Sequence, residues 1–301
     1  MDRLDSMSLL LIVAAAGSLS AAARRTGTPL ATVSRKISDL EAHLKTKLLN
    51  RSNRRLVPTD AGRSYIEACR RILDDIDGAE RAANGEYSAP RGALTIAAPI
   101  VFGRLHVLPV VTAFLATYPE IDIRLTLADR VSNLLEEHVD VALRIGTLPD
   151  SGLMAIRIGA LRRVICGSPA YFAAFGAPHS PADLSQHACV TFEGLMSSIA
   201  WTLGTSRSPT TVAIHSRLSV NTAEAAVDAA IAGLGLTRVL SYQAAQAIED
   251  GWLTIVLQSF EPEPWPVHLV YAGGRMLPIK LRAFLDFAAP RLRDRLASIG
   301  I

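Results

Sequence analysis

The chain has 301 residues, of which half are hydrophobic and a fifth are charged, a composition that excludes a mainly disordered protein and allows two domains. The formal net charge is only +3, so the chain as a whole is not polybasic. The basic charge is concentrated at one end, because residues 1–62 carry 10 Lys and Arg against 5 Asp and Glu, whereas the other 239 residues carry 21 against 23. We therefore expect an anionic partner for the N-terminal part alone.

Residues 4–25 predict two helices. Apolar residues recur at helical spacing over residues 4–16, and Gly17 is placed to end that helix. Ser18 is placed to cap a short second helix over residues 19–25. The first apolar run, residues 9–17, is too short for a membrane span, and helical pattern follows it directly, which argues against a cleaved signal peptide. We expect no segment that spans a bilayer and a cytoplasmic location.

A third helix follows a turn at Gly27 and runs to about residue 44. Thr28 is expected to cap it, with Pro29 at its first helical position. Its apolar residues are spaced four, three and four apart and so share one buried face, which consists of Val33, Ile37, Leu40 and Leu44.

A small hairpin with a basic tip, a "wing", is predicted over residues 47–58. A long helix then runs from Thr59 or Asp60 to about residue 86, and residues 87–92 form the linker. The apolar residues of this helix form a heptad seam made of Tyr65, Cys69, Ile72, Ile76, Ala79 and Ala83. Pairing with a second helix explains such a seam better than packing on the winged domain does.

After residue 92, strand and helix patterns alternate, which predicts an α/β region with mostly parallel strand pairing, either as one domain or as two lobes with a cleft between them. The expected strands cover residues 93–98, 121–127, 139–145, 161–166, 188–192, 211–220, 235–240 and 267–272. The expected helices cover residues 105–117, 222–232, 242–249 and 279–289.

The strongest functional signal is the helix–turn–helix pattern of residues 17–44. Its second helix sets small, polar and basic residues opposite the apolar face, a surface that fits the major groove of DNA. Residues 20–55 hold nine Lys and Arg against Asp39 and Glu41, which concentrates the attraction to phosphate there. An amphipathic core with a solvated basic face explains the same pattern without DNA, but the wing and the heptad helix favour DNA binding. The candidate DNA-binding residues are Ser20, Thr28, Pro29, Leu30, Ala31, Thr32, Ser34, Arg35, Lys36, Ser38, Arg51, Arg54 and Arg55.

These segments resemble LysR-type transcriptional regulators. The matching N-terminal stretches are GSLSAAARR, TVSRKISDLE and LLNRSNRRLVPTDAG, and the later ones are PRGALTIAAP, FLATYPEIDIRL, HVDVALRIGTL, CGSPAYF and AAIAGLGLTRVL, so the resemblance covers nearly the whole chain. Two departures affect local packing only: Asn50 precedes Arg51 where an aromatic residue is usual, and Lys45-Thr46 stands where a Gly is common.

The resemblance implies an all-α winged helix–turn–helix in residues 1–59, a dimerising linker helix and hinge in 60–91, and an effector-binding domain in 92–301 that resembles type 2 periplasmic binding proteins. Lobe I of that domain would take about residues 92–161 and 266–301, and lobe II about 162–265. The implied assembly is a homodimer or homotetramer that binds double-stranded promoter DNA under the control of a small-molecule effector.

The effector cleft is expected at the carboxyl ends of strands, where helix N-termini point. Free amides in residues 99–102 would suit a carboxylate, although this loop is less polar than the Ser/Thr-rich loop of many relatives. Thr222 and Glu224 suit a capping box, and Arg144 suits either an acidic effector or a nearby acid. Aromatic side chains, Phe192 and Trp201, wall the cleft or belong to the core. The resemblance implies these cleft-facing positions: Ala98, Pro99, Ile100, Val101, Phe102, Arg144, Ile145, Gly146, Phe192, Asn221, Thr222 and Leu236.

Several functions lack their signals. The sequence has no G-x-S-x-G, no P-loop and no G-x-G-x-x-G after a strand, so we expect no enzyme and no cofactor. Scattered histidines and three distant cysteines, Cys69, Cys166 and Cys189, predict free buried thiols and no metal site. Our interpretation is a sequence-specific transcriptional regulator. The alternative is a solute-binding protein whose N-terminal part only oligomerises.

Overall fold

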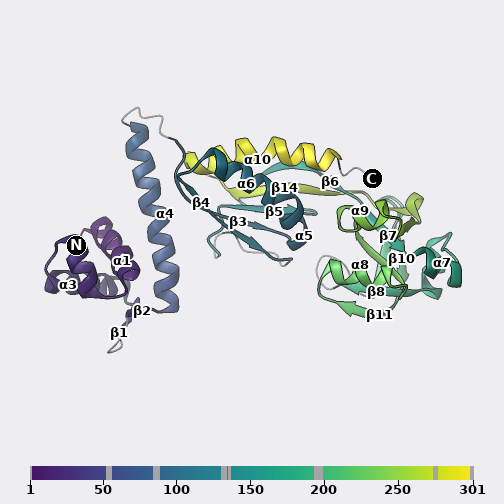
Figure 1. Cartoon of the computed structure of the whole chain (residues 1–301), viewed down its shortest axis with the longest axis horizontal. Coiled ribbons are helices and arrows are strands. Elements are labelled where there is room, and N and C mark those ends of the chain that lie inside the picture. The colour runs from purple at the N-terminus through teal and green to yellow at the C-terminus, as the bar shows by residue number, and fades with distance from the viewer. Residues whose placement is uncertain are drawn as a thin grey trace. The chain divides into compact units, whose positions relative to one another are not determined.

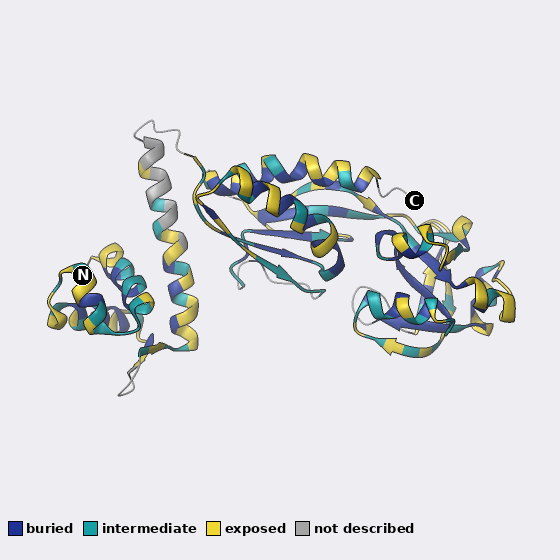
Figure 2. Cartoon of the chain, viewed as in Figure 1, coloured by how far each residue is buried: buried dark blue, intermediate teal, exposed yellow. Residues whose placement is uncertain are grey.

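The structure is a computed structural model that describes residues 2–51, 56–83, 89–129, 134, 137–192, 199–273 and 277–298. Contacts divide the chain into two compact units, Met1–Ala93 and Leu94–Ile301. Figure 1 shows the helical N-terminal unit in purple and blue and the α/β unit in teal to yellow. Buried residues concentrate inside each unit, as Figure 2 shows.

The N-terminal unit contains the predicted helices and hairpin. Its elements are α1 (Arg3–Ala16), α2 (Leu19–Thr26), α3 (Leu30–Leu44), the antiparallel strands β1 (Leu49–Arg51) and β2 (Leu56–Pro58), and α4 (Asp60–Ala83). Gly17 ends α1 and Gly27 ends α2, both in the left-handed conformation that favours glycine. The Ser18 hydroxyl accepts a hydrogen bond of 3.1 Å from the Ala21 amide, which confirms the predicted cap of α2.

The cap predicted for α3 is wrong by one residue. Pro29 occupies the N-cap position with ψ of 136°, so the helix begins at Leu30. The Pro29 carbonyl accepts hydrogen bonds from the amides of Thr32 (2.9 Å) and Val33 (3.1 Å), whereas the Thr28 hydroxyl donates to the Thr26 carbonyl at 3.4 Å. Proline fixes φ but not ψ, so an extended ψ at Pro29 moves the helix start one residue along.

The heptad seam predicted on α4 divides into two parts. Cys69 is buried in the core of the winged domain and Tyr65 packs against that core. By contrast, 41% of Ile72 is exposed and Ile76 is half-buried. The side chains of Ala79 and Ala83 and residues 84–86 of the predicted helix lie outside the description of the structure. The winged domain therefore covers the first turns of the seam and leaves Ile72 open.

In the part of the chain that the structure describes, the second unit is built on two five-stranded sheets. Sheet I has the order β4-β3-β5-β14-β6, and its strands are β3 (Gly92–Ala98), β4 (Ile121–Leu127), β5 (Val141–Ile145), β6 (Leu153–Leu161) and β14 (Trp265–Ala272). Sheet II has the order β11-β8-β12-β7-β13, and its strands are β7 (Arg163–Gly167), β8 (Ala188–Phe192), β11 (His215–Val220), β12 (Leu236–Leu240) and β13 (Thr254–Val256). A separate hairpin joins β9 (Ala200–Leu203) to β10 (Thr210–Ala213).

The expectation of mostly parallel pairing is wrong. Parallel pairs join β3 to β5 and join β8 to both β11 and β12. Antiparallel pairs join β14 to β5 and β6, and β7 to β12 and β13. The chain leaves sheet I through β6, enters sheet II through β7 and returns through β14, and these crossing strands run against their neighbours. The sequence pattern predicted no strand at β6, β9 or β13, because the apolar residues of these segments are too few or too mixed to show a clear period.

Within the described residues, seven further helical elements cover the two sheets or link their strands. They are α5 (Ile100–Phe102), a π-helical turn η1 (Gly103–Val107), α6 (Leu108–Thr117), α7 (Pro169–Phe175), α8 (Ala223–Ile231), α9 (Ser241–Glu249) and α10 (Ile279–Ser298), beside short 3₁₀ turns at Pro181–Gln186 and Gln258–Phe260. The predicted helix over residues 279–289 stops too early. Pro290 lies exposed inside α10, so its missing hydrogen bond faces away from the core, and the buried face continues through Leu292 and Leu296.

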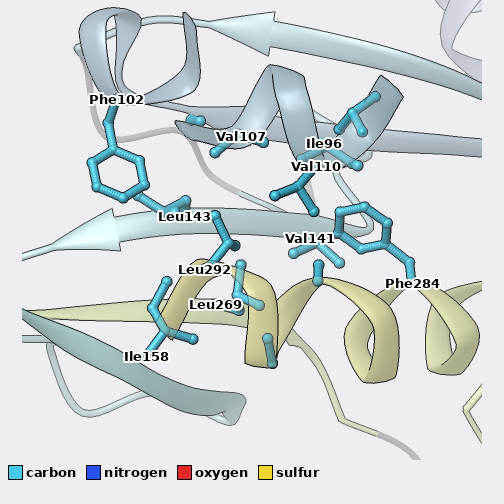
Figure 3. Close-up of a cluster of buried hydrophobic side chains, with 14 of the residues drawn as sticks. Ile96, Phe102, Val107, Val110, Val141, Leu143, Ile158, Leu269, Phe284 and Leu292 are labelled. Carbon is cyan, nitrogen blue, oxygen red and sulfur yellow. The ribbon is translucent and has the colours of Figure 1, made fainter. Parts of the chain in front are cut away.

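The helix predicted to begin at residue 105 instead begins at Ile100. The continuous helical run Ile100–Thr117 has 18 residues and a mean hydropathy of 1.7, which is long and apolar enough to cross a membrane and corrects the expectation that no segment is. Its residues Phe102, Val107 and Val110 pack with Ile96, Phe284 and other members of the core of sheet I (Figure 3). A core helix of a folded domain meets the same length and composition test.

Candidate functional site

The outer face of α3 presents most of the residues predicted to contact DNA. Val33, Ile37 and Leu40 turn inward and are buried, as predicted. Leu30, at the first helical position, is 49% exposed. The other exposed members of the predicted set are Ser20, Pro29, Ala31, Arg35 and Ser38, and the half-buried members are Thr28, Thr32, Ser34 and Lys36. Small and polar side chains at the start of this helix permit close approach to a groove.

One of the predicted cations is already engaged. The Lys36 ammonium forms an ion pair with the Asp5 carboxylate of α1, so it supports the packing of α3 on α1. Arg51 lies in β1, but its side chain is outside the description of the structure, as are Arg54 and Arg55. Arg35 is thus the exposed guanidinium that the structure places on α3.

A buried carboxylate, which sequence reasoning missed, ties α3 to the wing. Glu41 is 4% exposed, and its Oε1 accepts hydrogen bonds from the amides of Leu48 (2.9 Å) and Leu49 (3.1 Å), while Oε2 pairs with the Lys47 ammonium at 3.1 Å. Burial alone would raise the pKa of this carboxyl, but the Leu49 amide, the Lys47 ammonium and the Leu48 amide together hold the pKa below 4.5. The sequence did contain a signal for this contact, because Glu41 is an acidic residue next to Leu40 on the apolar face of α3.

Five of the twelve residues predicted to face the effector cleft are buried in hydrophobic cores. Ala98, Val101 and Phe102 belong to the core of sheet I, and Phe192 and Leu236 to the two cores around sheet II. Each is at most 3% exposed, and Trp201 is 1% exposed. Of the remaining predicted positions, Asn221 is exposed, Gly146 is buried, and Pro99, Ile100, Arg144, Ile145 and Thr222 are half-buried.

The amides at the start of α5 are less free than predicted. The Ile100 amide donates a hydrogen bond of 3.0 Å to Oδ1 of Asp129, and the Gly103 amide donates to the Pro99 carbonyl at 2.7 Å. A carboxylate of the protein therefore already occupies the position in which an effector carboxylate was expected. Asp129 follows β4, and nothing in the sequence linked it to residue 100.

An aromatic cluster joins the two sheets beside this turn. The ring of Tyr242, from α9, lies edge-on to Phe102 with centroids 5.3 Å apart and to His106 at 5.8 Å. Burial, with a smaller effect of Asp129, raises the pKa of Tyr242 well above its ordinary value. Burial and the Arg295 charge lower the pKa of His106 to about 4, so the ring is neutral near pH 7. Tyr242 and His106 were missed because the contact joins α9 to α5 and η1, which lie far apart along the chain.

The start of α8 is capped, but not by a capping box. The Thr222 hydroxyl accepts a hydrogen bond of 3.3 Å from the Ala225 amide, which makes Ala225 the third helical residue. Glu224 is one position too early for the reciprocal bond, and its buried Oε2 has no hydrogen-bond partner within the described residues. Arg144, another of the predicted cleft positions, lies in β5, and burial lowers the pKa of its guanidinium.

The thiol prediction is confirmed, since Cys69, Cys166 and Cys189 are all free and buried. Burial raises the pKa of Cys166 and of Cys189 to about 12, so neither is a reactive thiolate near neutral pH. Within the described ranges, no group of three or more His, Cys, Asp or Glu side chains could hold a metal ion.

A three-helix domain with a wing and an exposed recognition helix, followed by an α/β unit with two sheets, defines a DNA-binding regulator that carries its own ligand-binding domain. Residues 4–63 match the family described as "Bacterial regulatory helix-turn-helix protein, lysR family", and residues 88–293 match "LysR substrate binding domain". The chain belongs to the LysR family of transcriptional regulators.

Relatives and solved structures match along almost the whole chain. An HTH-type transcriptional repressor from Pseudomonas aeruginosa is 34% identical over 289 residues, which cover 95% of this chain and 91% of that protein. The full-length Vibrio cholerae virulence activator AphB is 28% identical with a TM-score of 0.60 and covers 95% of this chain and 98% of that one. CrgA from Neisseria meningitidis is 28% identical with a TM-score of 0.61 and covers 96% and 98%. None of these supports the alternative of a solute-binding protein.

Proposed function

We propose that the exposed face of α3 reads promoter DNA in the major groove, with Arg35 as its main base-contacting cation and the wing as a second contact. The observation that carries this proposal is that the inner face of α3 is buried while Leu30, Ala31 and Arg35 remain exposed at its N-terminal half. Ser20, on α2, would contact the DNA phosphate backbone next to the groove. The protein would act in the cytoplasm and catalyse no reaction.

The test is a binding assay over a range of salt concentrations. The full-length protein is titrated against its own upstream DNA and against a scrambled duplex of equal length. We expect discrimination between the two that survives moderate salt, because base contacts depend less on salt than phosphate contacts do. Equal and steeply salt-sensitive binding to both duplexes, and to other promoters tried in turn, would contradict sequence-specific recognition.

We further propose that α4 pairs two copies of the chain through the open part of its seam, with residues 60–91 as linker and 92–301 as effector domain. The exposed side chain of Ile72 on α4 supports this, since it is 41% exposed in one chain and the α4 helix of a second copy would cover it. Ile72→Asp is expected to weaken self-association in sedimentation analysis. Glu80→Ala, an exposed change on the same helix, is the control and should leave association unchanged.

The small-molecule effector is proposed to bind between the two sheets, near the half-buried positions Pro99, Arg144 and Thr222. Its binding would change DNA affinity by favouring one arrangement of the lobes. The relatives include both a repressor and an activator, so membership of the family does not determine the sign of regulation. The DNA assay, repeated with candidate metabolites, tests this coupling directly.

A further inference from the structure

Two arginines lie on one face of sheet II at the crossover from sheet I. Arg163 begins β7, and Arg238 lies in the antiparallel neighbour β12, where it stands opposite Ile165 while Leu240 stands opposite Arg163. Residues 163 and 165 point to the same side of a strand, so the two arginines are diagonal neighbours on one face. Arg238 is only 7% exposed.

Each guanidinium is held in position by an aromatic ring and a backbone carbonyl oxygen. Arg163 stacks on Trp265 with its Cζ 4.6 Å from the ring centroid, and Arg238 stacks on Trp201 at 5.3 Å. Arg163 Nη2 donates to the Glu263 carbonyl at 3.0 Å, and Arg238 Nη1 donates to the Thr202 carbonyl at 3.2 Å. The Nε atoms of both arginines are buried and have no hydrogen-bond partner in the part of the chain that the structure describes.

The acids of the adjacent return segment are committed elsewhere. Glu261 forms a two-point pair with Arg162, with Nε–Oε2 and Nη2–Oε1 distances of 2.8 Å, and Oε1 of Glu263 accepts from the Ser206 hydroxyl at 2.8 Å. Among the described residues, no carboxylate pairs with Arg163 or Arg238. Burial, together with the Arg163 charge, lowers the pKa of Arg238 to about 10. Two neighbouring cations, one of them buried, are costly unless an anion accompanies them.

We propose that Arg163 and Arg238 form a binding site for a small oxyanion, either a carboxylate or a phosphate, at the crossover between the two sheets. Planar guanidinium groups bind both anions through paired N–H donors, and the two unpartnered Nε atoms supply such donors. Arg238 belongs to sheet II, whereas Trp265, under Arg163, belongs to sheet I. An anion bound there would link the two sheets at their connecting segments. This site is separate from the residues proposed above for the effector.

Thermal unfolding of the full chain tests the site. Acetate and inorganic phosphate are each titrated at constant ionic strength against chloride, for the wild type, Arg238→Met and Arg207→Met. Arg207 is an exposed arginine of the same lobe and serves as the matched control. We expect a saturable rise in Tm for the wild type and the control and none for Arg238→Met, because only a bound ligand stabilises by mass action. Whether acetate or phosphate raises the Tm at the lower concentration distinguishes the two anion classes.

Two results would overturn the proposal. The first is a wild-type Tm that is the same in acetate and in phosphate as in chloride of equal ionic strength. The second is an Arg238→Met variant that keeps the full saturable rise in Tm. If Arg238→Met does not fold, Arg163→Lys replaces it, because lysine keeps the charge and loses the planar fork. The half-saturation concentration should then increase at least tenfold, and an unchanged value counts against the site. Operator discrimination is measured on the same wild-type preparation, so failure of the anion site and failure of DNA recognition are separate results.

Discussion

Helix α3, which is proposed to read DNA, and the helical run that begins at Ile100 both start directly after a proline, but they are held in opposite ways. No side chain among the described residues caps α3, and Leu30 and Ala31 in its first turn are exposed. At the second helix, Asp129 accepts from the first amide, and Val101 and Phe102 are buried. A helix start with free amides and exposed side chains can accept phosphate and base edges. A capped and buried start is a structural element that a small ligand can only adjoin.

The largest effect is expected where the second helix start is buried. Phe102→Ala should lower the free energy of unfolding by about 3–5 kcal/mol, because it removes a fully buried ring from the core of sheet I. Urea titration monitored by circular dichroism measures it. Leu108→Ala, at a position that is 46% exposed, is the control and should cost far less. A small effect of Phe102→Ala would mean that the ring is not part of this core.

The far end of α3 is expected to depend on its buried carboxylate. Glu41→Gln should cost about 1.5–3 kcal/mol at pH 7, because charge-assisted bonds to two amides and Lys47 are weakened. The folded-state pKa of Glu41 is lowered below 4.5, so its contribution is complete above that pH and is lost as the pH falls through the folded-state value. The difference in the free energy of unfolding between wild type and variant should therefore be much smaller at pH 3.5 than at pH 7. An equal difference in unfolding free energy at both pH values would contradict a lowered pKa of Glu41 in the folded state.

The exposed face of α3 should affect binding and leave stability unchanged. Arg35→Ala is expected to weaken specific DNA binding by about 1–3 kcal/mol, since one cationic fork to a base is lost. Its unfolding free energy should stay within about 0.5 kcal/mol of wild type because the side chain is exposed. Fluorescence anisotropy with operator and scrambled duplexes gives the first quantity. Arg207→Ala, which removes the same charge elsewhere, should leave discrimination intact.

The smallest expected effect concerns the cap that distinguishes the two helix starts. Asp129→Ala removes the acceptor for the Ile100 amide and should cost about 1 kcal/mol in urea unfolding. Thr28→Ala should cost only a few tenths, because the Thr28 hydroxyl does not cap α3. A larger loss for Thr28→Ala than for Asp129→Ala would reverse the contrast between the two helix starts.

Sequence patterns were informative where a single element determines the outcome. The spacing of Val33, Ile37 and Leu40 sufficed to separate the inner and outer faces of α3, and Ser18 sufficed to place the start of α2. The turn at residues 99–102 was predicted less well, because its environment is made by Asp129 and Tyr242, which are 27 or more residues away along the chain. Antiparallel crossings were also missed, since strand direction depends on the route between sheets and leaves no local pattern.

The position of β14 and α10 has a consequence for synthesis. These elements come last along the chain, yet β14 lies between β5 and β6 inside sheet I, and α10 buries Phe284 and Leu292 in the core of that sheet. Strand β3 therefore leaves the ribosome long before its sheet can be completed, by on the order of 10–40 s at ordinary elongation rates. During that interval all residues of the winged domain have been synthesised, whereas the apolar face of sheet I is not yet covered by α10. Nascent chains of this protein should accordingly depend on chaperones for the second unit and not for the first.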